Sequence, residues 1–164
     1  MPNAPTIDPV AEWTLHKRRV LVPFDFSEAS RKALQVARTF VPDVGEPSGG
    51  TVSVIHVITP PPMTAPGRLL RGPFDEERAI AKGFSALREA LADAGAQEFE
   101  PCVRVAPNPA EEVVAFAERE QTELIVISSH ARRGFDRWLL GSTAERVVRL
   151  APCPVVVLRG PTPQ

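Results

Sequence analysis

The chain has 164 residues, a formal net charge of −1 at pH 7 and 43% hydrophobic residues. A chain of this length can form one domain with a sizeable core. The near-neutral charge gives no overall attraction to nucleic acid or to an anionic membrane surface. No apolar stretch reaches the ~18 residues that a membrane-spanning helix needs. We therefore expect a soluble protein that binds neither nucleic acid nor membranes.

Residues 1–17 are polar and contain Pro2, Pro5 and Pro9. They lack a basic segment followed by an apolar one, so they do not resemble a signal peptide. We expect a flexible N-terminal tail, a single domain over residues 18–160, and a location in the cytoplasm.

Apolar patterns typical of strands and of helices alternate along the domain. Five stretches have strand-like patterns: Arg19–Asp25, Thr51–Ile58, Phe99–Val105, Leu124–Ile127 and Pro154–Leu158. Four stretches between them carry apolar residues three and four positions apart, as on one face of a helix. This alternation predicts an α/β fold with one open parallel sheet and helices on both faces.

Residues that start or stop helices mark the boundaries of these elements. Ser27 and Asn108 can accept hydrogen bonds at helix N-termini. Ser142 begins the sequence Ser-Thr-Ala-Glu, which matches a capping box. We expect the second helix over Phe74–Ala94. In the last helix, Ser142–Ala151, we expect four residues to face inward: Ala144, Val147, Val148 and Ala151.

The two cysteines, Cys102 and Cys153, lie in apolar, strand-like runs. Cysteine often behaves as a small hydrophobic residue, so we expect two buried, reduced thiols. Neither cysteine has the spacing to histidine that indicates a metal site. Residues Thr59–Pro73 contain five prolines and are expected to form a long surface excursion.

In open parallel sheets, ligands bind past the carboxyl ends of the strands, where the strand order reverses. This rule selects Asp25, the residues Val57–Pro60, and the chain from Ser128 onward. Asp25 could accept a hydrogen bond from a ligand amine or a ribose hydroxyl. It could equally be a turn residue before Ser27, and its position alone does not separate these interpretations.

The segment Ser128–Ser142 follows a buried strand and leads into a helix. Its main-chain N–H groups, its arginines and the helix N-terminus could together bind an anion. The alternative is a connecting loop with solvated arginines. His130 could contact a phosphate, but no catalytic arrangement with Ser, Cys or Asp accompanies it. The chain lacks the Gly-Lys-Ser/Thr pattern of a P-loop and a Gly-x-Gly-x-x-Gly fingerprint, which disfavours a motor-type NTPase or a dehydrogenase.

Four segments together resemble the universal stress protein family, over about Lys17–Arg159. They are Arg-Arg-Val-Leu-Val-Pro-Phe-Asp-Phe-Ser (18–27), Val-Ser-Val-Ile-His-Val (52–57), Glu-Leu-Ile-Val-Ile-Ser-Ser-His (123–130) and Leu-Leu-Gly-Ser-Thr-Ala-Glu-Arg-Val-Val-Arg-Leu-Ala-Pro-Cys-Pro-Val-Val-Val (139–157). The resemblance implies a Rossmann-like, five-stranded parallel sheet of order 3-2-1-4-5. It also implies a homodimer in which the final strands pair, with an interface at Pro154, Val155, Val156, Val157 and Leu158.

The ATP-binding members of this family carry the motif Gly-x2-Gly-x9-Gly-Ser/Thr. The matching positions here are Ser128, Ala131, Gly141 and Ser142. The spacing is kept, but two of the three glycines are replaced. An alanine in a left-handed conformation costs about 1 kcal/mol, so Ala131 is the more serious replacement.

The resemblance also implies roles for individual residues. Asp25 and the main chain around Val57 would hold ribose and adenine, in a pocket lined by Pro23 and Phe24. Seven residues would surround the phosphates: Ser128, His130, Ala131, Arg132, Gly141, Ser142 and Thr143. ATP, possibly with Mg²⁺, would be the ligand.

We therefore expect a stress-response regulatory dimer that binds ATP with little or no catalysis. The alternatives are a nucleotide-free dimer that binds partner proteins, favoured by Ser128 and Ala131, and a slow ATPase.

Overall fold

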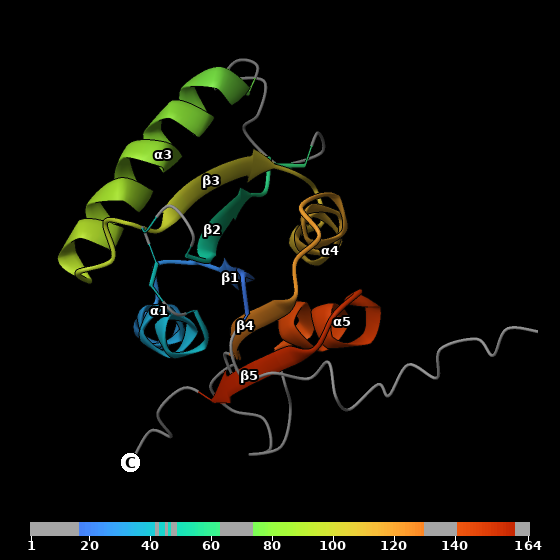
Figure 1. The fold of residues 1–164 in the computed structure, drawn as a ribbon. Helices are drawn as coiled ribbons and strands as arrows, with labels where there is room; N and C mark the ends of the chain where they lie inside the picture. Colours follow the sequence, from blue (N-terminus) through green and yellow to red (C-terminus); the bar gives the residue numbers. More distant parts are fainter. Residues whose placement is uncertain are drawn as a thin grey trace, which may run out of the picture.

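The computed structural model describes residues 17–41, 43–44, 46, 49–62, 74–129 and 141–159. Strands and helices alternate through these ranges (Figure 1). In chain order they are β1 (Arg19–Pro23), α1 (Glu28–Phe40), β2 (Thr51–Ile58), α3 (Glu76–Asp93), β3 (Glu100–Val105), α4 (Pro109–Arg119), β4 (Leu124–Ser129), α5 (Ser142–Leu150) and β5 (Val155–Arg159).

The strands form one parallel sheet of order β3-β2-β1-β4-β5. Figure 1 shows α1 and α3 on one face of this sheet and α4 and α5 on the other. The predicted α/β class, the strand order and the two helical layers are confirmed. Because helices cover both faces, β1 is apolar from Val20 to Pro23 and β4 from Leu124 to Ile127.

Side chains of the sheet alternate between two cores. Val22, Val54 and Val126 point into the core beneath α1 and α3. Leu21 and Ile125 point into the core beneath α4 and α5. These side chains are fully buried, which explains why the sequence shows continuous apolar runs here in place of alternating ones.

The predicted caps of α1 and α4 are confirmed. Ser27 accepts a hydrogen bond from the Ser30 N–H at 3.0 Å, and Asn108 accepts one from the Glu111 N–H at 3.4 Å. The helix expected to start at Phe74 starts later, because Asp75 accepts a hydrogen bond from the Arg78 N–H and caps it.

The helix α5 starts at Ser142 as predicted, but the predicted capping box is wrong. Gly141 is the N-cap, so Ser142 is the first helical residue, and none of the side chains that the structure describes caps the helix. A capping box needs its serine one position before the helix, in extended backbone. With Ser142 inside the helix, Glu145 falls one position too late to complete the box.

The inward face of α5 is also smaller than expected. Ala144 and Val147 are buried, but Val148 is 44% exposed and Leu150 is 42% exposed. The periodicity of the sequence identifies apolar residues, but Val148 lies outside the core beneath α4 and α5.

Residues 1–16 and 63–73 lie outside the described residues, so the expected tail and most of the proline-rich excursion are not described. Lys17 is packed against the domain, and its N–H donates to the Phe40 carbonyl at 2.7 Å. None of the helices within the described ranges is long and apolar enough to cross a membrane.

Candidate functional site

The sheet opens between β1 and β4 at its carboxyl edge. β1 pairs with β2 along its whole length, from Arg19 to Pro23. In the described strands, β1 pairs with β4 at two positions alone, Val20 with Leu124 and Leu21 with Ile125. β4 then continues beside β5 as far as Ser129. The strand order reverses at this same place, which is where parallel sheets bind ligands.

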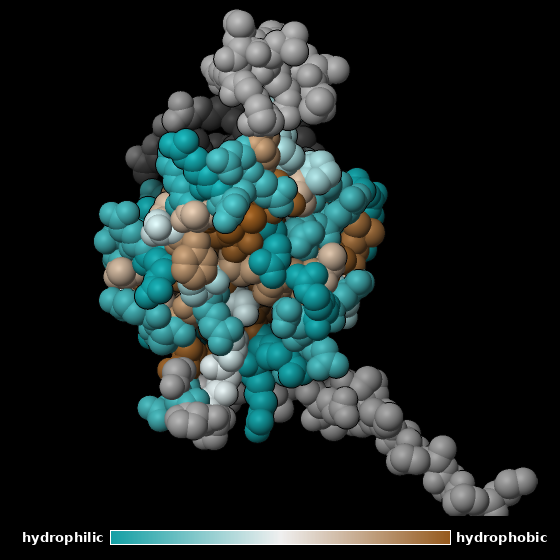
Figure 2. Space-filling model, turned by 90° about the horizontal axis from the view of Figure 1, so that it is seen from above, coloured by the Kyte–Doolittle hydropathy of each residue, from teal (hydrophilic) through white to brown (hydrophobic). Residues whose placement is uncertain are grey.

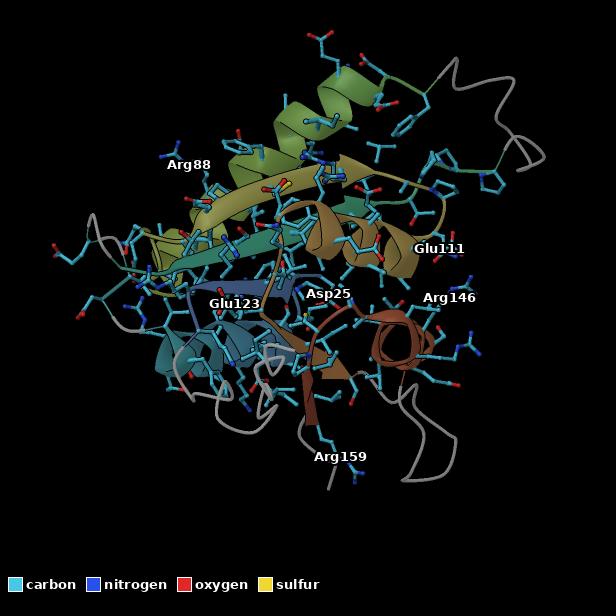
Figure 3. The ribbon with its side chains drawn as sticks, turned by 45° about the vertical axis from the view of Figure 1, so that its right-hand side comes forward. Asp25, Arg88, Glu111, Glu123, Arg146 and Arg159 are labelled. Carbon is cyan, nitrogen blue, oxygen red and sulfur yellow. The ribbon has the colours of Figure 1, made fainter. Side chains whose placement is uncertain are left out.

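Asp25 lies directly past the end of β1, at the tip of the strand (Figure 3). The Phe24 N–H donates to the Ile55 carbonyl at 2.8 Å, and the Ser27 N–H donates to Oδ1 of Asp25 at 3.1 Å. The Asp25 side chain is nevertheless exposed. Asp25 therefore has the turn role that the sequence analysis considered for it. A carboxylate can accept several hydrogen bonds, so this turn bond is compatible with a further one that a ligand donates.

The main chain of Val57 faces the opening. Ile55 directs its carbonyl toward β1, where it accepts from Phe24, and Ile58 directs its carbonyl toward β3, where it accepts from Ala106 at 3.0 Å. Main-chain groups of successive strand residues point to alternate sides, so Val57 shares the direction of Ile55. Its N–H and C=O therefore face the side of β1, beyond the last β1 residue that pairs with β2, Pro23.

The N-terminus of α5 lies at the same edge of the sheet. Val155 pairs with Ile125 near the start of β4, so the end of α5 lies at the amino edge of the sheet and its start lies at the carboxyl edge. Ser142 and Thr143 are exposed there. Helices α1, α3 and α4 have side-chain caps, whereas the N-cap of α5 is Gly141 and no described side chain caps it. The N–H groups of a first helical turn and the helix dipole favour an anion.

The remaining predicted site residues divide into two groups. Ser128 is half-buried near the end of β4, and its neighbour Ser129 is buried. Pro23 is half-buried, and Phe24 is 3% exposed within the α1/α3 core, so its main chain is the part that borders the opening. Three predicted phosphate contacts lie outside the described residues: His130, Ala131 and Arg132.

Sequence reasoning gave no site role to His56 or Phe26. The His56 Nδ1 lies 2.8 Å from the Phe24 carbonyl oxygen, and its ring meets the Phe26 ring edge-to-face at 4.7 Å. Phe26 has a φ of 65°, a left-handed conformation. A histidine within an apolar strand carries no signal of such a contact. The position of Phe26 between an aspartate and a helix cap was the available hint of an unusual turn.

Both cysteines are free but half-buried, where full burial was expected. The reason is that Cys102 lies on the edge strand β3 and Cys153 precedes the edge strand β5, so neither is enclosed by a neighbouring strand. Burial raises the pKa of the Cys102 thiol, and the nearby Arg104 and Arg119 guanidinium groups offset part of that rise. Burial likewise raises the pKa of Cys153.

We expect slow alkylation of both thiols by iodoacetamide at mildly alkaline pH. A raised pKa leaves less of the nucleophilic thiolate at a given pH. Mass spectrometry of timed samples, with free cysteine as the reference and denatured protein as the control, measures this. Native thiols that react as fast as denatured ones would contradict it.

Comparison with known proteins places this geometry in a family. The family model of the Universal stress protein family matches residues 17–159. The chain belongs to the universal stress protein family. A relative from Thermus aquaticus, the universal stress protein in QAH/OAS sulfhydrylase 3'region, is 28% identical over 145 residues, which cover 87% of this chain and 98% of that protein. Universal stress protein MJ0531 of Methanocaldococcus jannaschii is 49% identical over 53 residues, which cover 32% of this chain and 31% of that protein.

Solved structures show the same fold. Universal stress protein UspA from Lactobacillus plantarum superimposes with a TM-score of 0.65 at 24% identity, covering 88% of this chain and 99% of that one. A universal stress protein from Archaeoglobus fulgidus in complex with dAMP gives a TM-score of 0.53 at 24% identity, covering 86% and 97%. A universal stress protein in complex with cAMP gives 0.57 at 18% identity, covering 85% and 94%.

Proposed function

We propose that this universal stress protein is a stress-response regulator that binds ATP as a homodimer, in the cytoplasm, with little or no catalysis. The observation that carries the nucleotide part is the opening between β1 and β4. Asp25, the Val57 main chain and the start of α5 all lie at its edge.

Each part of an adenine nucleotide has a matching group there. The outward main chain of Val57 offers one donor and one acceptor, which suit the edge of a purine. The exposed carboxylate of Asp25 suits a ribose hydroxyl, and the N–H groups of Gly141–Thr143 suit phosphate. The complexes of two structural neighbours with dAMP and cAMP support a nucleotide as the ligand.

Mg²⁺ fits this proposal as a companion of ATP. Within the described ranges, no three His, Cys, Asp or Glu side chains are grouped to hold a metal ion. Magnesium in nucleotide sites is held largely by phosphate oxygens and water. We therefore propose that the ion enters with the nucleotide, and that this chain's residues act on the phosphates.

The dimer part rests on a contrast between the two edges of the sheet. β5 presents the uncharged sequence Val-Val-Val-Leu, all half-buried, followed by Arg159. β3 carries Pro101, and its charged residues Glu100 and Arg104 are exposed. Figure 2 looks down on the side where α3 and β3 lie, and hydrophilic residues cover much of it around a hydrophobic area near its centre. Prolines and charges discourage edge pairing, so β5 is the edge suited to a second copy.

Isothermal titration calorimetry tests nucleotide binding directly. We expect ATP to release or absorb heat with one site per chain, and GTP to bind more weakly because its purine edge is different. The nucleotide content of protein purified without added ligand is an independent measurement. A protein that carries no nucleotide and gives no heat at millimolar ATP would exclude the proposal.

The replaced glycines favour a second candidate, a nucleotide-free dimer that binds partner proteins. If position 131 requires a left-handed backbone, Ala131→Gly should strengthen ATP binding by about fivefold, which corresponds to the ~1 kcal/mol cost of alanine there. Ala106→Gly, at a buried position past β3, is the matched control and should leave affinity unchanged. Binding that appears in the Ala131→Gly variant alone would support the second candidate.

A further inference from the structure

We propose that His56 is a positioning residue: its imidazole holds the turn that carries Asp25 and keeps the Val57 main chain available to the ligand. This inference rests on the proposed function, because it explains how the nucleotide site is organised. It depends on three contacts around Phe24, Phe26 and His56.

The first contact fixes the tautomer of His56. A carbonyl oxygen can accept a hydrogen bond but cannot donate one, so Nδ1 must carry the proton that bridges the 2.8 Å to Phe24. When the imidazole is neutral, its other nitrogen, Nε2, is then unprotonated. The structure therefore assigns His56 the Nδ1–H form.

This hydrogen bond occurs where the ladder between β1 and β2 ends. Phe24 donates its N–H to Ile55, so its carbonyl points toward β2 as well. In a continued ladder, the partner of that carbonyl would be the N–H of Val57. The imidazole of the preceding residue supplies a donor to it, and the Val57 main chain can then serve a purine.

The second and third contacts hold the turn itself. Phe26 has a φ of 65°, which is costly for a bulky residue. Its ring packs edge-to-face on His56, with centroids 4.7 Å apart, and on Phe24, with centroids 5.3 Å apart. Aromatic pairs at such distances are stabilising, which offsets part of the backbone strain. Asp25 thus lies between Phe24 and Phe26, which both contact His56.

Three substitutions separate the hydrogen bond from the ring. His56→Asn places an amide N–H where Nδ1–H was, while His56→Gln carries its amide one bond further out. His56→Phe keeps the ring but has no donor. We expect ATP affinity within about threefold of wild type for His56→Asn, and about tenfold weaker for His56→Gln and His56→Phe, a tenfold change being ~1.4 kcal/mol. Equal losses in all three variants would overturn the role of the Nδ1 hydrogen bond.

Two measurements on the unliganded protein decide the same question without ATP. Two-bond proton–nitrogen NMR spectra of the wild-type protein, recorded where the His56 imidazole is neutral, should show Nδ1 protonated and Nε2 unprotonated. Amide exchange of Ser27, whose N–H donates to Asp25, should accelerate in His56→Phe and stay slow in His56→Asn. An Nε2–H tautomer, or unchanged exchange in His56→Phe, would reject the inference. If wild type shows the predicted tautomer and exchange but binds no ATP, the proposed function fails and the positioning of Asp25 stands.

Discussion

Replacing Val157 with proline is expected to convert the proposed dimer into a folded monomer. The Ile125 N–H donates to the Pro154 carbonyl at 3.0 Å, so residues 154, 156 and 158 direct their main chain toward β4. Val155 and Val157 direct theirs toward the open edge. Proline at position 157 removes an outward N–H that a second copy would use, and proline is tolerated on edge strands at such positions. Sedimentation velocity and circular dichroism measure assembly and folding.

Val156→Pro is the matched control for this substitution. It differs by one position but removes an N–H that faces β4 and belongs to the ladder inside the subunit. We expect it to lower the free energy of unfolding by about 3 kcal/mol or more. A wild type that is monomeric at all concentrations, or a Val157→Pro variant that remains a dimer, would exclude assembly through β5.

Replacing Asp25 with alanine is expected to weaken ATP binding by about ten- to a hundredfold. Hydrogen bonds to charged groups contribute roughly 1.5–3 kcal/mol, and Asp25 is the exposed carboxylate at the end of β1. Asp25→Asn is the matched variant, because its amide oxygen can still accept from the Ser27 N–H. We expect Asp25→Asn to keep the stability of wild type and to lose most of the affinity. Calorimetry and chemical unfolding measure the two effects separately.

Nucleotide analogues identify the part of the ligand that Asp25 contacts. If the carboxylate accepts a ribose hydroxyl, 2′-deoxy-ATP should bind wild type more weakly than ATP but bind Asp25→Ala equally well. If it accepts the adenine amine, inosine triphosphate should show that pattern in its place. Such a cycle isolates the pairwise interaction energy. Additive effects with both analogues would show that Asp25 acts on the turn alone.

Much of the fold could be predicted from local sequence. Alternating strand and helix patterns predicted the α/β class, because the two periodicities report directly which side chains must face a core. The caps at Ser27 and Asn108 were also predictable from local sequence, because the free N–H groups of a helix N-terminus need a hydrogen-bond acceptor close by. The strand order came from the resemblance of four segments to a known family.

The candidate site was predictable in part. Asp25, Val57, Ser128 and Gly141–Thr143 were selected by their places after strands or before a helix, and the described positions lie at the expected edge of the sheet. The capping role of Ser142 was not correct, because a shift of one residue at a helix end changes little in the periodicity.

The sequence by itself determined which residues are apolar, which segments become strands and helices, and where acidic and small residues follow them. The tertiary structure alone decided that β1 parts from β4 after Leu21 and Ile125, that the Val57 main chain faces this opening, and that His56 donates to the Phe24 carbonyl. The physical reason is that hydrogen bonds between strands join residues far apart in sequence. Their register and their ends depend on neighbours that no local pattern contains.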